Sequence, residues 1–253
     1  MKKINAVVTG GASGLGEATV REIIRNAGSV AIFDSQEERG NILSEELGEN
    51  CIFLKTDVTS EKSINNSLSS TLSKFKFVNL LVNCAGIGIA NKVVGKEKLH
   101  DSKVFQKVID VNLLGTFNVL KLTVKNMLEN IPDDDGFRGV IINTASIAAF
   151  DGQIGQAAYS ASKGAIVSLT LPLAREFAKY GIRVCTIAPG LFETPMMVGL
   201  PQKAYDNLVD STLYPKRLGK PDEFANLALS IFENNMLNGE VIRLDGSLRM
   251  SPK

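Results

Sequence analysis

The stretch TGGASGLG occupies residues 9–16, directly after the apolar run Ile4–Thr9 and before a helical pattern. Its glycine spacing, G-x-x-x-G-x-G, is longer than the common G-x-G-x-x-G dinucleotide fingerprint. Glycines let the backbone approach a pyrophosphate, and the unpaired N–H groups at a helix N-terminus attract it. Glycine clusters in strand-to-helix turns also occur without a ligand. The motif therefore indicates a dinucleotide-binding turn at Gly10, Gly14 and Gly16, with a ligand-free turn as the alternative.

Apolar, β-rich runs recur along the rest of the chain, each separated from the next by enough sequence for a helix. They are Ile4–Thr9, Ser29–Asp34, Cys51–Thr56, Leu80–Cys84, Val140–Ala145, Ile182–Ile187 and Glu240–Leu244. Such alternation is typical of parallel strands joined by crossover helices. The sequence predicts an α/β fold: one Rossmann-type, doubly wound parallel sheet of about seven strands, with helices on both faces, in a single domain over residues 1–253.

The charge balance gives no reason to expect a polyanionic partner, because 28 Lys and Arg face 27 Asp and Glu, a net charge of +1. The longest apolar run, Gly139–Phe150, is shorter than the ~20 residues of a bilayer span. Cys51, Cys84 and Cys185 are widely spaced, which favours free thiols in a reducing compartment. The sole histidine, His100, supports neither a metal site nor a Ser-His-Asp hydrolase and is interpreted as a solvated loop residue.

Two segments are predicted to be surface insertions. Asn91–Lys103 has little apolar periodicity, and Asn130–Arg138 carries proline, glycine and consecutive aspartates, which is turn chemistry. The lysines of the first insertion are Lys92, Lys96, Lys98 and Lys103. The few residues that precede the first apolar run are too short for a cleavable signal built on this domain, so a cytoplasmic location is expected, with an uncleaved organelle signal left open.

The carboxylate of Asp34 is placed at the end of the second predicted strand, where it can accept hydrogen bonds from the ribose hydroxyls of an adenosine. A 2′-phosphate there would meet like charge, and the next basic residue along the chain is Arg39. This pattern favours NAD over NADP. A solvent-facing aspartate after a strand is the alternative. Asp57, after the third strand, suits an adenine contact.

Tyr159 and Lys163 lie four residues apart in YSASK, so they share one face of a predicted helix. A free tyrosine titrates near ~10, and use as a base near neutrality needs a shift of ~3 units, or about 4 kcal/mol. One unit charge at ~4 Å, with an effective dielectric constant of ~20, supplies about that much. The pair therefore indicates a tyrosine base assisted by a lysine.

Ser146 and Asn112 complete the catalytic hypothesis. Ser146 comes just after the fifth predicted strand, at the edge where open α/β sheets bind ligands, and its hydroxyl can hold the substrate oxygen. Asn112 lies in the preceding helical pattern and is expected to bind a water that extends a proton relay from Lys163. Taken singly, each residue has a structural alternative: a helical tyrosine packs, and a serine after a strand caps.

The segment 191–215 is predicted to form an apolar lid over the active site, which suits an acyl chain or steroid better than a sugar. Its apolar residues include Leu191, Phe192, Met196, Met197, Val198 and Leu200. A methionine-rich packing segment is the alternative. Glu193 puts a carboxylate in the same loop, with its effect on binding left open. Pro172 is expected to kink the long helix after Lys163 without splitting it.

The chain resembles the short-chain dehydrogenase/reductase family over essentially its whole length. The residues that carry the resemblance are TGGASGLG at 9–16, Asp57, NCAG at 83–86, Asn112, Ser146, YSASK at 159–163 and Pro189-Gly190. The resemblance implies an NAD(P)-binding domain with a catalytic tetrad of Asn112, Ser146, Tyr159 and Lys163. The family's usual NNAG motif has an asparagine where this chain has Cys84.

Further segments are similar to one branch of that family, whose members use NAD to oxidise 3-hydroxyacyl-CoA and hydroxysteroids and form mitochondrial homotetramers. These segments are NCAG, the insertion 91–103, GVIINTAS at 139–146, FDGQIGQAAYSASKG at 150–164, TIAPGLF at 186–192 and LNGEVIRLDG at 237–246. The resemblance implies a mitochondrial matrix location, with cytoplasm as the alternative, and acyl-CoA or steroid substrates.

By position, the resemblance implies NAD contacts at Gly10, Ser13, Gly14, Leu15, Gly16, Asp34, Asp57, Val58, Cys84, Ala85, Gly86, Tyr159, Lys163, Pro189, Gly190, Phe192 and Thr194. It implies substrate contacts at Ser146, Tyr159 and Gln156. The lysines of the 91–103 insertion are hypothesised to meet the phosphates of coenzyme A, with a merely solvated loop as the alternative. A competing interpretation is an interaction subunit of a mitochondrial tRNA-processing complex, which would bring nucleic acid only as an indirect partner.

Overall fold

The computed structural model describes residues 3–195 and 202–252, and its centre is one parallel sheet with the strand order β3-β2-β1-β4-β5-β6-β7. The strands are β1 (Asn5–Thr9), β2 (Ser29–Asp34), β3 (Cys51–Lys55), β4 (Leu80–Asn83), β5 (Gly139–Thr144), β6 (Ile182–Pro189) and β7 (Val241–Leu244). All seven predicted strands are confirmed. Strands β1, β2 and β6 are buried along their whole length, as continuous apolar runs between two helical layers require.

Helices fill the crossovers between these strands. They are α1 (Gly14–Arg25), α2 (Glu37–Leu47), α3 (Glu61–Phe75), α4 (Ser102–Ile109), α5 (Thr116–Met127), α6 (Ala157–Ala178), α7 (Gln202–Ser211) and α8 (Pro221–Glu233). A π-helical turn, Asp110–Gly115, joins α4 to α5, and a 3₁₀ turn, Ile147–Ala149, follows β5. Helix α6 contains Pro172 and remains one continuous helix, as expected.

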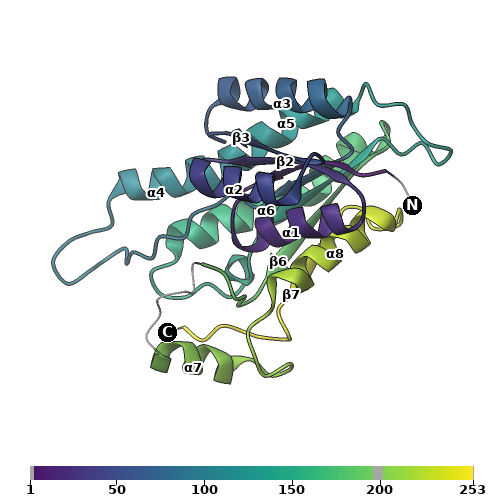
Figure 1. Cartoon of the computed structure of the whole chain (residues 1–253). Coiled ribbons are helices and arrows are strands. Elements are labelled where there is room, and N and C mark those ends of the chain that lie inside the picture. Colours follow the sequence, from purple (N-terminus) through teal and green to yellow (C-terminus); the bar gives the residue numbers. More distant parts are fainter. Residues whose placement is uncertain (1–2, 196–201, 253) are drawn as a thin grey trace.

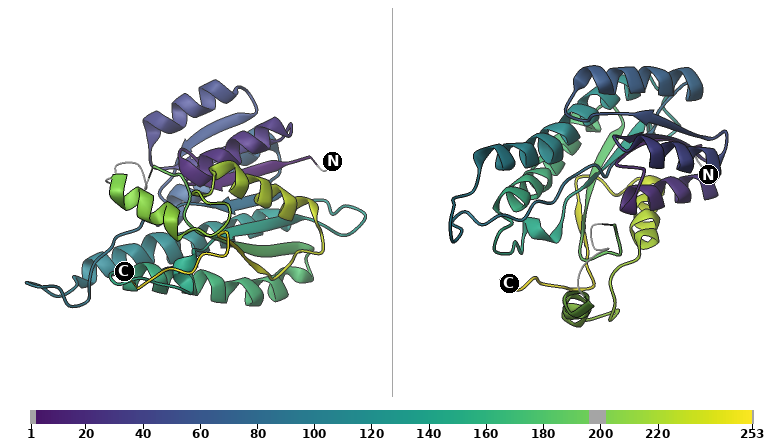
Figure 2. Two further views of the ribbon diagram at one scale, coloured as in Figure 1. Left: turned by 90° about the horizontal axis from the view of Figure 1, so that it is seen from below. Right: turned by 60° about the vertical axis from the view of Figure 1, so that its left-hand side comes forward.

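The sheet is covered on both faces (Figures 1 and 2). Helices α1, α2 and α8 pack on one face through a core cluster that includes Val20, Leu43 and Phe224. Helices α3, α5 and α6 pack on the other face through a cluster that includes Leu68 and Leu120. These two buried layers confirm the predicted doubly wound architecture.

The strand order reverses at β1, which lies between β2 and β4. The chain leaves β1 toward the face covered by α1, and it continues from β4 to α4 and α5, of which α5 packs on the opposite face. Connections that diverge in this way leave a crevice at the carboxyl ends of the strands, where open α/β sheets bind ligands. The topology therefore places the glycine turn and the segment after β4 on two sides of one crevice.

The two predicted insertions differ in how they meet the body of the protein. Residues 91–100 project from it as a loop with a bridge between Val94 and Leu99, both of which are exposed (Figure 1). Lys103 belongs instead to the first turn of α4. The second insertion is a surface excursion only in part, because its Phe137 is buried edge-on against Phe232 of α8. Within the described ranges, no helix has the length and apolar content that a membrane crossing needs.

Candidate active site

The glycine turn between β1 and α1 leaves no room for a side chain at Gly10 or Gly16. Gly10 and Gly14 have φ angles of 62° and 55°, in the region that favours glycine. A Cβ on Gly16 would lie 2.1 Å from the carbonyl oxygen of Gly10. Ser13 precedes the first turn of α1 and makes no side-chain cap bond to it. The helix N-terminus therefore keeps backbone N–H groups directed at the crevice, as an anion site requires.

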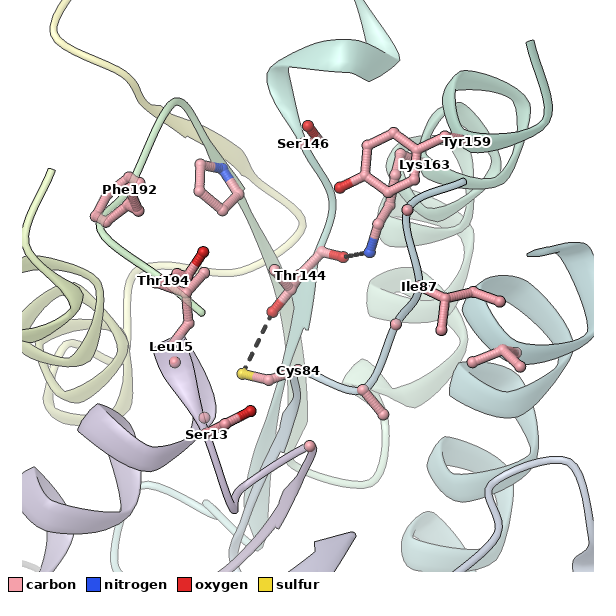
Figure 3. Close-up of a pocket in the computed structure, with 18 of the residues that line it drawn as sticks. Ser13, Leu15, Cys84, Ile87, Thr144, Ser146, Tyr159, Lys163, Phe192 and Thr194 are labelled. Atoms are coloured by element: carbon pink, nitrogen blue, oxygen red, sulfur yellow. Dashed lines mark hydrogen bonds between the residues drawn. The ribbon is translucent and has the colours of Figure 1, made fainter. Parts of the chain in front are cut away.

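A cavity of about 830 Å³ extends along the carboxyl ends of the strands, and Figure 3 shows the part around Cys84 and Thr144. Every residue that the family resemblance assigns to cofactor or substrate by position lines it, whereas the catalytic candidate Asn112 and the lysines of the 91–103 insertion do not. The predicted residues that line it are Gly10, Ser13, Gly14, Leu15, Gly16, Asp34, Asp57, Val58, Cys84, Ala85, Gly86, Ser146, Gln156, Tyr159, Lys163, Pro189, Gly190, Phe192 and Thr194. Segments that lie far apart in the sequence therefore line one cavity and form one candidate ligand site.

Asp34 is fixed at one end of this cavity by backbone donors. The N–H of Ala12 donates to one carboxylate oxygen at 3.0 Å, and the N–H of Gln36 donates to the other at 3.0 Å. The residue is buried. Asp57 lies nearby on the cavity wall, where the N–H and hydroxyl of Thr59 hold one of its carboxylate oxygens. Both carboxylates retain free lone pairs that can accept hydrogen bonds from a ligand.

Cys84 occupies the floor of the cavity between the two ends. Its sulfur accepts a hydrogen bond from the Thr144 hydroxyl at 3.6 Å (Figure 3). Burial raises the pKa of the Cys84 thiol to about 11, against the opposing effects of that hydrogen bond and of Lys163. The group is therefore a neutral thiol at physiological pH, and it contributes shape rather than a nucleophile.

Tyr159 and Ser146 bring two hydroxyls to the same side of the cavity, from α6 and from the end of β5 (Figure 3). The Ser146 oxygen also accepts the N–H of Ala148 at 3.1 Å, so it both caps the turn after β5 and faces the cavity. Burial raises the pKa of Tyr159, and a hydrogen bond with Ser146 opposes that rise. The two hydroxyls can hold one substrate oxygen and exchange one proton with it.

Lys163 lies one turn along α6 from Tyr159 and is buried beneath it. Its ammonium donates to the carbonyl oxygen of Thr144 at 2.7 Å and lies 5.8 Å from the centre of the Tyr159 ring. Burial lowers the pKa of Lys163 to about 8. The sequence argument expected the lysine charge to dominate and lower the pKa of Tyr159. The structure shows the reverse direction for the Tyr159 pKa, because desolvation acts on both groups and disfavours the charged form of each.

Asn112 lies behind the cavity in the π-helical turn and is fully buried. Its side-chain oxygen accepts the N–H of Ile87 at 2.8 Å, and its side-chain nitrogen donates to the Ile87 carbonyl and the Ser162 hydroxyl. The expected relay used the Asn112 side chain to bind a water. These bonds fix the segment after β4 that lines the cavity, and the water-mediated relay stays a prediction.

Gln156 keeps its predicted place on the substrate side, where its side-chain oxygen accepts the N–H of Gln153. The lid is described only in part. Leu191 and Leu208 line the cavity, and Glu193 is exposed and outside the lining. The apolar positions Met196, Met197, Val198 and Leu200 lie outside the described residues.

Sequence reasoning missed several contributors to this site. The Thr144 carbonyl, which holds Lys163, is a backbone group that no residue pattern reveals. Met250 lines the cavity from the C-terminal segment, and Ser162 supports Asn112. Ser162 lies within YSASK, which is the signal that would have found it. In the part of the chain that the structure describes, no group of three or more His, Cys, Asp and Glu side chains could hold a metal ion.

Comparison with known proteins gives consistent matches. The model of the short chain dehydrogenase family matches residues 4–204. The chain is 52% identical over 254 aligned positions to 3-hydroxyacyl-CoA dehydrogenase type-2 of Homo sapiens, covering 100% of this chain and 97% of that protein. Among solved structures, 3-hydroxyacyl-CoA dehydrogenase type-2 from Mycobacterium avium superposes with a TM-score of 0.95 at 41% identity, covering 99% of this chain and 97% of that one. The 3-ketoacyl-(acyl-carrier-protein) reductase from Brucella melitensis, complexed with NADH, has a TM-score of 0.86 at 29% identity, covering 98% of both chains.

Proposed function

The chain belongs to the short-chain dehydrogenase family, and from that premise we propose that it interconverts a secondary alcohol and a ketone with NAD, acting on 3-hydroxyacyl-CoA and its 3-keto form. The observation that carries the proposal is the pair of Tyr159 and Ser146 hydroxyls above the buried Lys163, in a cavity that also holds the glycine turn. The names of the relatives from Homo sapiens and Mycobacterium avium support the acyl-CoA substrate.

The residues of the cavity fit a nicotinamide dinucleotide, and the NADH complex of the Brucella melitensis reductase supports the same cofactor class. The N–H groups at the start of α1 would hold the pyrophosphate, and the Asp34 carboxylate, which the Ala12 N–H fixes in place, would accept hydrogen bonds from the adenosine ribose. A 2′-phosphate beside the carboxylate of the buried Asp34 would meet like charge, which supports NAD over NADP. A bound nicotinamide would supply the hydride acceptor for alcohol oxidation and the hydride donor for ketone reduction.

The side chains of the protein handle the proton. Ser146 donates a hydrogen bond to the substrate oxygen and orients it toward Tyr159, which takes the hydroxyl proton during oxidation and returns it during ketone reduction. Lys163 is mostly protonated at neutral pH, because its pKa is about 8. Its positive charge, one turn from Tyr159 on α6, favours the phenolate form that Tyr159 passes through when it exchanges the proton.

The substrate side of the cavity is largely apolar, which suits an acyl chain and also accommodates a steroid. Its apolar lining residues are Ile87, Ile89, Ala90, Ile147, Ala148, Leu191, Leu208 and Met250. The 91–100 loop begins beside it, where the N–H of Asn91 donates to the carbonyl of Gly155. This position supports a contact of the loop lysines with the phosphates of coenzyme A.

The central test follows NADH absorbance with the purified protein and acetoacetyl-CoA. We expect Tyr159→Phe to lower kcat about 10²- to 10⁴-fold while NADH binding persists. Tyr180→Phe, a change of the tyrosine that follows the other end of α6, is the matched control and keeps wild-type turnover. A wild-type protein that binds NADH but turns over no acyl-CoA would remove the substrate proposal. Equal use of NADPH would remove the Asp34 argument.

The coenzyme A contact has its own test. Replacing Lys92, Lys96, Lys98 and Lys103 together with alanine should raise the KM for acetoacetyl-CoA and leave that for NADH unchanged, because the phosphates lose their counter-charges. An unchanged KM for acetoacetyl-CoA would overturn the contact. A triple change of the exposed Lys62, Lys74 and Lys76 controls for lost positive charge away from the cavity.

We also propose that the protein forms a homotetramer in mitochondria, because the chain resembles the mitochondrial, homotetrameric branch of the family. Phe105, Leu114 and Phe117 are at least 37% exposed on α4, the π-helical turn and α5, which supports an apolar contact with another copy. Light scattering of the purified protein measures the assembly, and imaging of a C-terminally tagged chain measures its location. The alternative role in a tRNA-processing complex stays a prediction that none of the described residues tests.

A further inference from the structure

The C-terminal segment returns to the active site after the last strand. Residues 245–252 leave β7 and pass beside α7 (Figures 1 and 2). Met250 of this segment lines the cavity. Leu248 is 2% exposed, so the segment is anchored in the protein before it reaches the cavity. Met250 is half-buried there, and its apolar side chain lines the same cavity as Leu208 of α7.

Arg243 of β7 ties this segment to the loop before α6. Its Nη2 donates to Asp151 Oδ2 at 2.5 Å and to the Leu248 carbonyl at 3.0 Å, while its Nε donates to Asp245 Oδ2 at 2.7 Å. The guanidinium lies 5.1 Å from the centre of the Phe150 ring. One side chain therefore joins β7, the C-terminal segment and the loop 150–156.

The position of this cluster makes it stronger than a surface ion pair. The side chains of Arg243, Asp151 and Asp245 are 21%, 19% and 7% exposed. Charge-assisted bonds at this depth are screened less by water than exposed pairs, and the planar guanidinium fixes their direction. Without it, two carboxylates would face each other across the loop and the C-terminal segment, and like charges at that range repel.

Backbone bonds continue the connection up to the cavity. The N–H of Ile154 donates to the Pro252 carbonyl at 3.0 Å, and the side-chain amide of Gln153 donates to the Ser251 carbonyl at 3.1 Å. Gln153 itself lines the cavity. On its other side, the loop bonds to Asn91 at the base of the lysine-bearing segment. The loop 150–156 therefore lies between the lysine-bearing segment on one side and the C-terminal segment with the apolar Met250 on the other.

We propose that residues 245–252 form a fixed wall of the substrate site, in which Met250 contacts the acyl chain and Arg243 is the positioning residue that holds the wall against the loop. The inference rests on the acyl-CoA function proposed above. The apolar chain lies along Met250 and Leu208, while the phosphates lie on the side of the lysines. The wall therefore selects for chain length.

The activity test compares acetoacetyl-CoA with 3-ketodecanoyl-CoA. Met250→Ala should raise the ratio of the KM for 3-ketodecanoyl-CoA to the KM for acetoacetyl-CoA about fourfold, because the longer acyl chain loses apolar contact worth about one methylene. Arg243→Met should give the same pattern, with partial rescue in Arg243→Lys. Arg249→Met is the matched control. Arg249 also bonds to Asp245, but among the described residues it makes no bond to the loop 150–156. This variant should therefore keep the wild-type KM for both substrates.

A second measurement needs no substrate. Hydrogen exchange at the Ile154 amide reports its bond to Pro252 directly, and Arg243→Met should speed that exchange at least tenfold, whereas Arg249→Met leaves it unchanged. NADH affinity, which reports the rest of the fold, should stay within twofold in all four variants.

Each outcome decides the inference. An equal rise in KM for both substrates, or no rise in Met250→Ala, would overturn the acyl-chain contact. Unchanged Ile154 exchange in Arg243→Met, or equal effects in Arg249→Met, would overturn the positioning role. If the wild-type protein reduces no acyl-CoA, the proposed function fails, and the exchange measurement still decides the role of Arg243.

Discussion

Replacing Lys163 with methionine should change the stability of the protein in a way that depends on pH. Lys163 is 6% exposed, and burial lowers the pKa of its ammonium from 10.5 to about 8. Below pH 8 the folded protein holds a charge that burial disfavours. Between pH 8 and pH 10.5 the unfolded chain binds the proton more strongly than the folded one, so the wild type gains stability as pH rises through this window. Above pH 10.5 Lys163 is neutral in both the folded and the unfolded protein, so its burial no longer lowers the stability.

The magnitude follows from the difference between those two pKa values. One pKa unit is worth about 1.4 kcal/mol, so the buried charge of Lys163 costs about 3 kcal/mol at pH 7. Methionine has a similar length and no charge, but it loses the bond to the Thr144 carbonyl, worth about 1 kcal/mol. Lys163→Met is therefore expected to be about 2 kcal/mol more stable than wild type at pH 7 and about 1 kcal/mol less stable above pH 10.5.

Urea unfolding of the two proteins at a series of pH values from 7 to 10.5 measures this difference, and titrations common to both cancel in it. Lys121→Met, which removes an exposed ammonium paired with Glu61, controls for the loss of one positive charge from the surface. A stability difference between Lys163→Met and wild type that stays constant across this range would refute the burial argument. Loss of NADH oxidation in a more stable variant would show that the charge is kept for catalysis at the expense of stability.

Three further changes test other parts of the site. Ser146→Ala removes the hydrogen bond that opposes the rise in the Tyr159 pKa, so the pH at which alcohol oxidation reaches half of its maximal rate should move upward. A pH profile of steady-state rates that does not shift would contradict the effect of Ser146 on Tyr159. Asp34→Ser removes the charge that repels a 2′-phosphate, and the ratio of NADH to NADPH in kcat/KM should fall about tenfold or more, whereas an unchanged ratio would mean that another group sets the preference. A Cβ on Gly115 would lie 2.7 Å from Val58 Cγ2, so Gly115→Ala should push the Val58 side chain into the cavity. Fluorescence titration should then show NADH binding weakened about threefold or more. An unchanged NADH affinity would place Val58 away from the cofactor.

The fold was predictable because its signals are local and repeated. Continuous apolar runs such as Val140–Ile142 are typical of strands covered on both faces, and the structure buries them in that way. The glycine turn was readable for the same reason, since Gly10 and Gly16 stand where a side chain meets backbone atoms. The shared helix face of Tyr159 and Lys163 follows from the period of the helix alone.

The sequence by itself determined the element order, the strands, the glycine turn and the residue types that come together at the sheet edge. Tertiary structure alone decided the direction of the Tyr159 and Lys163 pKa shifts, since desolvation depends on how many atoms surround a group and not on its neighbours in the chain. It also decided the partners of Lys163 and Asn112, which are the carbonyl of Thr144 and the backbone of Ile87. Every residue carries a backbone carbonyl, and every residue except proline carries a backbone N–H. A pattern of side chains therefore cannot show which backbone group a distant side chain will contact.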